Sequence, residues 1–210
     1  MNLHKPLQNY LDELSSNSPT PGGGNVAALC GVLASSLGQM VCNLTIGKKK
    51  YLDFESGAKD ILIELENLKK EFLTLAEKDN EAFDRVMDAF KLPKDNEAQI
   101  AFRKSAIEKA TLEAAFIPEE VIIKCNELIP LLNEIAEKGN QNSLSDTGVA
   151  ISLTTAAAEG AFLNVAINCS GLTNQITARE FLKKSEIIYN EVKEKSRIII
   201  NAIIKKMINH

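Results

Sequence analysis

The sequence predicts an all-α protein, a helical bundle that forms one domain over residues 1–210 and assembles as a dimer. No stretch alternates polar and apolar residues as a β-strand does. Two stretches, 25–46 and 146–169, are nearly free of charge and long enough to be buried helices. Helices that are apolar on every side must be surrounded, and one chain of this size surrounds one more easily than two. We therefore expect a homodimer.

Composition limits the classes of function. Hydrophobic residues make up 45% of the chain but aromatic residues only 5%, which predicts an aliphatic core. The net charge of −4 gives no support for binding to nucleic acid. The first residues are polar and mixed in charge, so we expect no signal peptide and a cytoplasmic protein.

Cysteine and histidine give no sign of a metal site. The four cysteines lie far apart without a CxxC pair, which is typical of buried free thiols in a reducing compartment. The only histidines are His4 and His210, at the two ends of the chain. We expect no metal site, no histidine-dependent triad and no bound cofactor.

The first half of the chain predicts three helices. Residues 3–15 carry leucines and a tyrosine at helical spacing, which indicates a short amphipathic helix. A loop rich in proline and glycine leads to the uncharged helix 25–46. Residues 47–56 are predicted to be a polar connector, and a long helix follows over 57–90, ending before Pro93.

The second half predicts four more helices. One covers 96–116, and Pro118 is expected to begin a new helix that ends near Gly139. The second uncharged helix covers 146–169. The last helix, 174–208, is amphipathic and basic toward its end.

Three consecutive glycines, Gly22, Gly23 and Gly24, precede the first uncharged helix. Glycine lets the backbone pass close to another group, and the start of a helix offers free N–H groups to an anion. The helix itself is long enough to span a membrane. Its polar residues, such as Gln39 and Asn43, make a poor lipid-facing surface, so we expect a helix buried in a soluble core and no membrane contact.

One acid lies where an apolar side chain is expected. At about 100° per residue, the apolar side chains of helix 57–90 fall within about 40° of one direction, and Asp79 points there too. They are Ile61, Leu65, Leu68, Phe72, Leu75, Phe83, Val86 and Phe90. Such a carboxylate is costly unless it is paired or neutralised, so we expect a displaced pKa. It is either a structural carboxylate, capping a neighbouring helix or held in an ion pair, or a general acid or base.

Two groups of charged and polar residues lie next to the uncharged helices. Lys48, Lys49 and Lys50 follow the first one, as a solvated connector or as an anion site. Ser145 and Asp146 stand at the start of the second, where helix capping is the usual role.

Asparagines inside the uncharged helices have two possible roles. Asn43 lies late in the first helix, and Asn164 and Asn168 lie one turn apart on the second. Each amide either bridges helices or binds a planar ligand that forms hydrogen bonds, and bridging is the favoured role.

Four segments carry a resemblance to a known family. They are PTPGGGNVAA, NLTIGKKKY, EKDNEAFDRVMDAFKLPK and SDTGVAISLTTAAAEGAFLNVAIN, in this order. Over about residues 3–205 the chain resembles the cyclodeaminase/cyclohydrolase family. This family comprises the C-terminal domain of formiminotransferase-cyclodeaminase and stand-alone bacterial relatives that include methenyltetrahydrofolate cyclohydrolase. One departure is Asn25, which stands where a serine is common after the glycines.

The resemblance implies an all-helical dimer that acts on one-carbon tetrahydrofolates, with Asp79 as its catalytic residue. It also implies folate contacts near the glycine turn, the lysine run and the start of the second uncharged helix. Asn43 and Asn164 complete the expected substrate-binding set. The lysines and the glycine-rich helix start would hold the anionic glutamate tail, which can be polyglutamylated.

Two reactions fit this resemblance. In the cyclodeaminase reaction, a step of histidine degradation, 5-formiminotetrahydrofolate closes to 5,10-methenyltetrahydrofolate and releases ammonia. In the cyclohydrolase reaction, water opens the methenyl compound to 10-formyltetrahydrofolate. The sequence places the first ahead by a small margin, and a non-catalytic folate-binding or assembly protein is a third reading. Neither reaction requires a metal or a redox cofactor.

Overall fold

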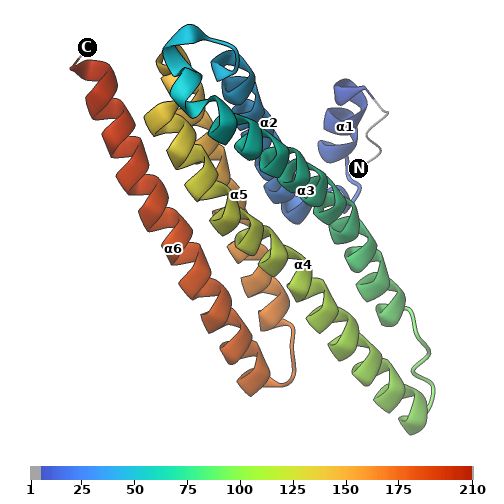
Figure 1. Ribbon diagram of the computed structural model, residues 1–210. Coiled ribbons are helices and arrows are strands. Elements are labelled where there is room, and N and C mark those ends of the chain that lie inside the picture. The colour runs from blue at the N-terminus through green and yellow to red at the C-terminus, as the bar shows by residue number, and fades with distance from the viewer. Residues whose placement is uncertain (1–5, 210) are drawn as a thin grey trace.

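A computed structural model describes residues 6–209, which form α-helices and short 3-10 helices without any strand (Figure 1). The elements are α1 (Leu7–Leu14), α2 (Gly23–Thr45), η1 (Lys49–Phe54), α3 (Glu55–Phe90), α4 (Glu97–Lys138), η2 (Gln141–Ser143), α5 (Leu144–Ser170) and α6 (Gln175–Ile208). The all-α prediction is confirmed, and most helix limits agree with it within two residues. The two histidines lie outside the described residues.

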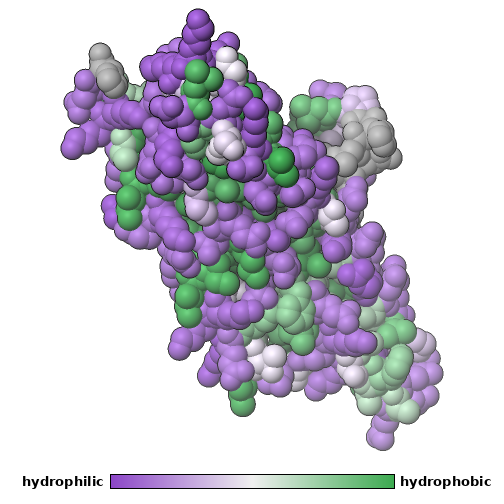
Figure 2. Space-filling model, in the orientation of Figure 1, coloured by the Kyte–Doolittle hydropathy of each residue, from purple (hydrophilic) through white to green (hydrophobic). Residues whose placement is uncertain are grey.

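The bundle has two layers. In Figure 1, α3, α4 and α6 lie in front, and α2 and α5 lie behind them, side by side and antiparallel. The largest fully buried side chains, among them Phe72 of α3, Leu132 of α4 and Ile151 of α5, fill the space between the helices. Figure 2 shows the front of the molecule, where hydrophilic side chains cover most of the surface.

Small residues on α2 let α3 and α4 approach it closely. A Cβ on Gly31 would lie 2.5 Å from Cδ1 of Phe72, and a Cβ on Gly38 would lie 2.9 Å from side-chain carbons of Leu65 and Leu132. Real Cβ atoms are not found at such distances, so the large side chains fit only because α2 carries glycine there. These two glycines of α2 therefore serve helix packing.

The prediction of a break at Pro118 is wrong, because α4 runs without interruption from Glu97 to Lys138. Proline lacks the N–H that would bond to the carbonyl of Ala114, four residues earlier. Nδ2 of Asn168 donates to that carbonyl at 3.4 Å, from the neighbouring helix α5. This bond supplies part of what the proline removes, and it is a helix-bridging role for an asparagine.

The connector after α2 is also more ordered than predicted. Residues 49–54 form η1, and the start of α5 is tied to this region. The backbone N–H of Asn140 donates to Oγ1 of Thr45 at 2.9 Å, and that of Gln141 donates to the hydroxyl of Tyr51 at 3.0 Å. The end of α2 and the start of α5 therefore lie at the same end of the bundle.

The two uncharged helices are only partly buried within the chain. Both α2 and the stretch Gln141–Ser170 are apolar and long enough to cross a membrane on length and composition alone. In the most apolar window of 18 residues, the buried share is 56% for α2 and 39% for Gln141–Ser170. The rest of each window is exposed or only partly buried in the chain.

Candidate active site

Asp79 reaches from α3 to the start of α2. The N-cap residue of α2, Gly22, has no side chain that could accept a hydrogen bond, so the helix begins with uncapped N–H groups. The backbone N–H of Asn25 donates to the carboxylate of Asp79. An acid on one helix therefore caps the N-terminus of another.

The backbone of Gly24 lies directly against this carboxylate. A Cβ on Gly24 would lie 2.7 Å from Cγ and 2.9 Å from Oδ2 of Asp79, and closer still to Oδ1. A Cβ on the neighbouring Gly23 would meet only Nδ2 of Asn164, at an ordinary 3.6 Å. Of these two glycines, Gly24 is the one whose missing side chain makes room for the acid.

Asp79 and the glycine turn line one cavity of about 340 Å³. Its walls come from the loop before α2, the start of α2, the last third of α3 and the end of α5, with one residue of α4. The lining residues are Pro19, Thr20, Gly22, Gly23, Gly24, Asp79, Ala82, Phe83, Val86, Ala114, Asn164, Ile167 and Asn168. The structure thus brings together five of the predicted site residues: Asp79, the three glycines and Asn164.

Burial in these surroundings raises the pKa of Asp79, and the hydrogen bond from the N–H of Asn25 opposes this effect only in part. The side chain is half-buried, so one part of the carboxyl group is held by the helix start while it also borders the cavity. Asp79 can therefore cap the helix start and also face a ligand in the cavity from the same position. A half-buried carboxyl group with a raised pKa is suited to take up and release a proton.

Asn25 fixes the position of this helix start, a role that the sequence did not reveal. Its side chain is fully buried and accepts a hydrogen bond from the hydroxyl of Tyr10 at 2.9 Å. Its Nδ2 donates to the carbonyl of Ala76 at 2.7 Å and lies 3.5 Å from Oδ1 of Asn80. The amide therefore joins α1, α2 and α3 one turn from Asp79, and the departure from serine was the only signal.

The two asparagines of α5 differ in their bonding. Nδ2 of Asn164 donates to the carbonyl of Gly160 in its own helix at 2.8 Å, while its side chain borders the cavity. Asn168 also borders the cavity, but its amide is bonded to Ala114 of α4. In both residues the bonded atom is Nδ2, so each amide oxygen is left for a ligand in the cavity.

The other predicted site residues lie elsewhere in the chain. Lys48, Lys49 and Lys50 are exposed at the far end of α2, which has 23 residues and is therefore about 34 Å long. Ser145 and Asp146 lie in the first turn of α5, at the same far end.

Asn43 does not border the Asp79 cavity either. It is exposed and lines a separate hollow of about 470 Å³ between α2 and α3, with Gln39 and Glu66 among its neighbours. Within one chain, the residues predicted for substrate binding thus form two groups at opposite ends of the bundle. Asn43, in the last turn of α2, lies at the end with the lysines.

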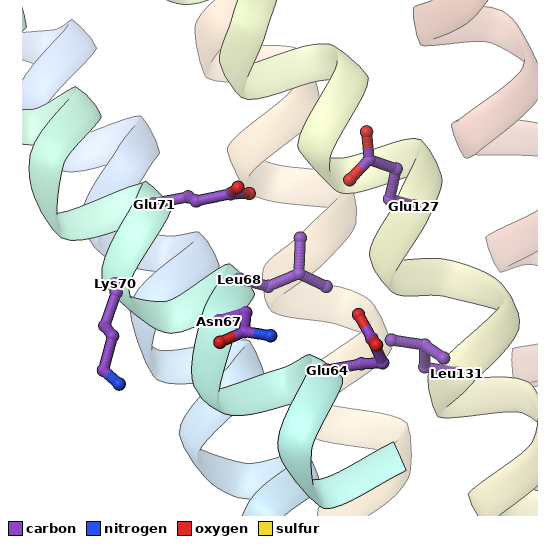
Figure 3. A pocket seen from close by; sticks show the side chains of 7 residues that line it. All are labelled: Glu64, Asn67, Leu68, Lys70, Glu71, Glu127 and Leu131. Carbon is purple, nitrogen blue, oxygen red and sulfur yellow. The ribbon is translucent and has the colours of Figure 1, made fainter. Parts of the chain in front are cut away.

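A larger groove of about 690 Å³ lies between α3 and α4 (Figure 3). Glu64 and Glu71 of α3 and Glu127 of α4 border it. Lys124 bonds to both Glu71 and Glu127 at 3.0 Å, so its charge is already shared between two acids. The remaining negative charge makes this groove a poor place for an anionic ligand.

Thiol and metal chemistry find little support among residues 6–209. All four cysteines are free, and burial raises the pKa of each of them, to about 12 for Cys42. A thiol with a raised pKa is a weak nucleophile at neutral pH. No group of three or more acids, histidines and cysteines that could hold a metal ion occurs in this part of the chain.

Comparison with known proteins gives one consistent result. Residues 6–186 match the family model described as formiminotransferase-cyclodeaminase. The chain is 42% identical over 183 residues to methenyltetrahydrofolate cyclohydrolase of Methylorubrum extorquens, covering 87% of this chain and 88% of that protein.

Two further similar proteins are named as cyclodeaminases and not as cyclohydrolases. The chain is 29% identical over 202 residues to formimidoyltransferase-cyclodeaminase of Gallus gallus, covering 96% of this chain but spanning only 37% of that protein. The crystal structure of formiminotetrahydrofolate cyclodeaminase from Thermotoga maritima has a TM-score of 0.80 and 31% identity, with 96% of this chain and 98% of that chain covered.

Proposed function

The chain belongs to the formiminotransferase-cyclodeaminase family of folate one-carbon enzymes, and from this premise we propose that Asp79 is the general acid and base of its reaction. The observation that supports this role is the half-buried carboxyl group, with its raised pKa, at the edge of a cavity bordered by the glycine turn. Proton transfer by a positioned carboxyl group typically contributes about 10²–10⁴-fold to a rate.

The reaction that we favour is hydrolysis of 5,10-methenyltetrahydrofolate to 10-formyltetrahydrofolate. The sequence alone places ammonia elimination slightly ahead. The higher identity, 42% over 87% of the chain, is to a protein named as the cyclohydrolase, and this reverses the order.

In this reaction Asp79 would take a proton from the water that attacks the cationic bridging carbon between N5 and N10. The C–O bond forms, and the carboxyl group returns a proton to N5 as the bond from carbon to N5 breaks. The hydroxyl proton is lost as the formyl group on N10 is completed. While ionised, the carboxylate also stabilises the positive charge of the bridging carbon.

The rest of the cavity is suited to holding the reacting part of a folate. Phe83, Val86 and Ile167 provide apolar walls for aromatic rings, and Asn164 provides an amide at one side. Burial beside these walls also raises the pKa of Asp79.

Ammonia elimination from 5-formiminotetrahydrofolate is the second candidate, favoured by the likeness to the Thermotoga maritima structure. Here N10 would attack the formimino carbon and lose its proton to Asp79. The same carboxyl group would then protonate the departing amine. Both reactions involve the same carbon and the same proton carrier.

One pair of assays separates these candidates. We expect the purified protein to accelerate the loss of methenyl absorbance from 5,10-methenyltetrahydrofolate above the buffer rate, without release of ammonia. Faster formation of methenyl absorbance and ammonia from 5-formiminotetrahydrofolate would make the second reaction the main one. If neither substrate reacts, the proposed function is wrong.

A further inference from the structure

Asn25 contacts one turn of α3 through both its backbone and its side chain. Its backbone N–H donates to the carboxylate of Asp79, and its Nδ2 donates to the carbonyl of Ala76, three residues earlier on the same helix, at 2.7 Å. The amide nitrogen also lies 3.5 Å from Oδ1 of Asn80. Because both groups belong to one residue, a movement of the Asn25 side chain relative to α3 also moves the N–H that faces Asp79.

This anchoring matters because α2 begins without a capping side chain of its own. Gly22 is the N-cap residue, and Gly23 and Gly24 form the first positions of the helix. Glycine has more conformational freedom than any other residue, so the turn is not fixed by its own backbone. Asn25 is the first residue of α2 with a side chain, and its amide is therefore the first group of the helix that can fix this turn.

The amide oxygen of Asn25 is held by α1. The hydroxyl of Tyr10 donates to this Oδ1 at 2.9 Å. Tyr10 is 6% exposed, whereas Leu7 and Leu11 of the same helix are 68% and 45% exposed, so Tyr10 is the side chain through which α1 enters the bundle. Since the Asn25 side chain is fully buried, water cannot take the place of the hydroxyl as a donor.

The hydroxyl of Tyr10 keeps its proton at neutral and acidic pH. Burial raises the pKa of Tyr10 above its usual value, and the neighbouring thiol of Cys30 on α2 raises it further. Burial also raises the pKa of Cys30. Below about pH 8 both groups are therefore uncharged, and the hydroxyl remains a donor to Asn25.

We propose that Tyr10 and Asn25 are positioning residues for the reaction: the hydroxyl on α1 holds the amide of Asn25, and this amide keeps the backbone N–H of Asn25 against the carboxylate of Asp79. The proposal rests on the proposed function, because it assigns the pair an effect on proton transfer by Asp79. Among the described residues, α1 adds none to the lining of the cavity, so its effect on the reaction passes through Asn25.

Loss of this support should change the pKa of Asp79 in one direction. Burial raises that pKa, and the hydrogen bond from the N–H of Asn25 lowers it. A weaker bond leaves the effect of burial less opposed, so the pKa rises further. Of the described residues that line the cavity from α2, α3, α4 and α5, Asp79 is the one with a titratable side chain, and its charged neighbours along α3, Glu77 and Lys78, are exposed. The acidic limb of a pH–rate profile should therefore report Asp79.

Tyr10→Phe tests the effect on catalysis. We expect the acidic limb of kcat with 5,10-methenyltetrahydrofolate to move to higher pH by about one unit, so that kcat on this limb falls roughly ten-fold while KM changes less than about two-fold. Circular dichroism at the assay temperature checks that the variant is folded. A bond that serves only stability would leave the limb in place, so a folded Tyr10→Phe enzyme with the wild-type pH profile would overturn the proposal.

Tyr189→Phe is the matched control. It removes the hydroxyl of a second buried tyrosine, which lies on α6 and bonds to Nζ of Lys193. We expect its pH profile to match that of the wild type. If Tyr189→Phe moves the acidic limb as far as Tyr10→Phe does, the shift is a general result of destabilisation and the proposal is wrong.

A double variant tests the route through the amide. Asn25→Ala removes the amide but keeps the backbone N–H, and we expect it to move the acidic limb at least as far as Tyr10→Phe does. Once the amide is absent, the hydroxyl has nothing to hold, so Tyr10→Phe should move the limb no further in the Asn25→Ala enzyme. Additive shifts would mean that Tyr10 does not act through Asn25.

Carbon-13 NMR of protein labelled at aspartate Cγ gives the pKa of Asp79 without any substrate, and Asp79→Asn identifies its resonance. We expect this pKa to be about one unit higher in Tyr10→Phe than in the wild type, and unchanged in Tyr189→Phe. If the shift occurs but neither folate reacts with the wild type, the proposed function is wrong and the positioning of Asp79 by Tyr10 stands. If no shift occurs, the positioning proposal is wrong whatever the activity.

Discussion

The carboxylate of Asp79 lies against the backbone of Gly24, in space that any side chain at position 24 would occupy. The two residues are far apart in the sequence and on different helices, yet each determines what the other can be. The acid needs a neighbour without a side chain, and the helix start needs an acceptor that its own glycine cap does not offer.

Gly24→Ala should therefore damage the site more than the fold. The new Cβ would lie 2.7 Å from Cγ of Asp79, so the carboxyl group must turn away from the helix start. We expect turnover to fall by roughly 10–10²-fold, as for a misplaced catalytic group. Gly23→Ala is the matched control, because its Cβ meets only ordinary contacts. Equal loss of kcat in both variants would contradict this explanation.

Asp79→Asn should abolish most of the activity while leaving the cavity its shape. The amide is nearly the same size but cannot take up a proton, so we expect kcat to fall by about 10²–10⁴-fold. Asp84→Asn, on an exposed position of the same helix, serves as the control and should keep wild-type kcat. Steady-state rates at saturating substrate measure both, and a fully active Asp79→Asn enzyme would remove Asp79 from the mechanism.

The same substitution should stabilise the protein at neutral pH. Because burial raises the pKa of Asp79 in the folded state, ionisation of this group favours unfolding. That cost is absent below the unfolded-state pKa of about 3.9, grows as the pH rises toward the folded-state pKa, and is constant above it. Urea unfolding of both proteins should therefore show a gain for Asp79→Asn at pH 7 that shrinks as the pH falls toward the unfolded-state pKa of about 3.9. A gain that increases in acid would contradict the raised pKa.

Tyr10→Phe should loosen the attachment of α1. The variant leaves Oδ1 of the buried Asn25 without the hydroxyl that donates to it, at a cost of about 1–3 kcal/mol in the free energy of unfolding. Tyr189→Phe is a suitable control, because its hydroxyl bonds to Nζ of Lys193, which is exposed and can turn to water. Urea denaturation compares the two, and an equal loss in both would argue against a special role of the Asn25 network.

Asn168→Ala tests whether the side chain of Asn168 compensates for the backbone N–H that Pro118 lacks in α4. Loss of the amide leaves the carbonyl of Ala114 without its donor, which should cost about 1 kcal/mol. Pro118→Ala restores a backbone N–H to that carbonyl, so the cost of Asn168→Ala should shrink when both changes are combined. A double-mutant cycle of unfolding free energies measures this coupling. Additive effects would mean that the hydrogen bond contributes nothing.

Helical periodicity was sufficient to find Asp79, because one acid in an otherwise apolar stripe stands out at a spacing of 3.6 residues. Only part of the predicted apolar stripe is buried. Its first five apolar members, as far as Leu75, are buried, whereas Phe83 and Val86 border the cavity and Phe90 is 48% exposed. The end of the stripe is therefore a wall of the site and not part of the core.

Other features depend on contacts between segments that are far apart in the sequence, so they could not be predicted from local patterns. The carbonyl of Ala114, which Pro118 leaves without a backbone donor, accepts a hydrogen bond from Asn168, fifty residues after the proline. The role of Asn25 depends on Tyr10 and Ala76, which come from two other helices. No local pattern distinguishes such an amide from the other polar residues of an uncharged helix.

The grouping of site residues was likewise not visible in the sequence. The glycine turn and the lysine run flank the same helix, so they are close along the chain. A helix of 23 residues keeps them about 34 Å apart.

The glycines of α2 also restrict how its length can change. A single inserted residue would turn every later side chain by about 100° and carry Gly31 and Gly38 away from the bulky groups that fit over them. Whole turns would be needed to restore the pattern, and these would shift one end of the molecule relative to the other. Insertions and deletions among relatives should therefore collect in the loops, such as residues 91–96, and spare this helix.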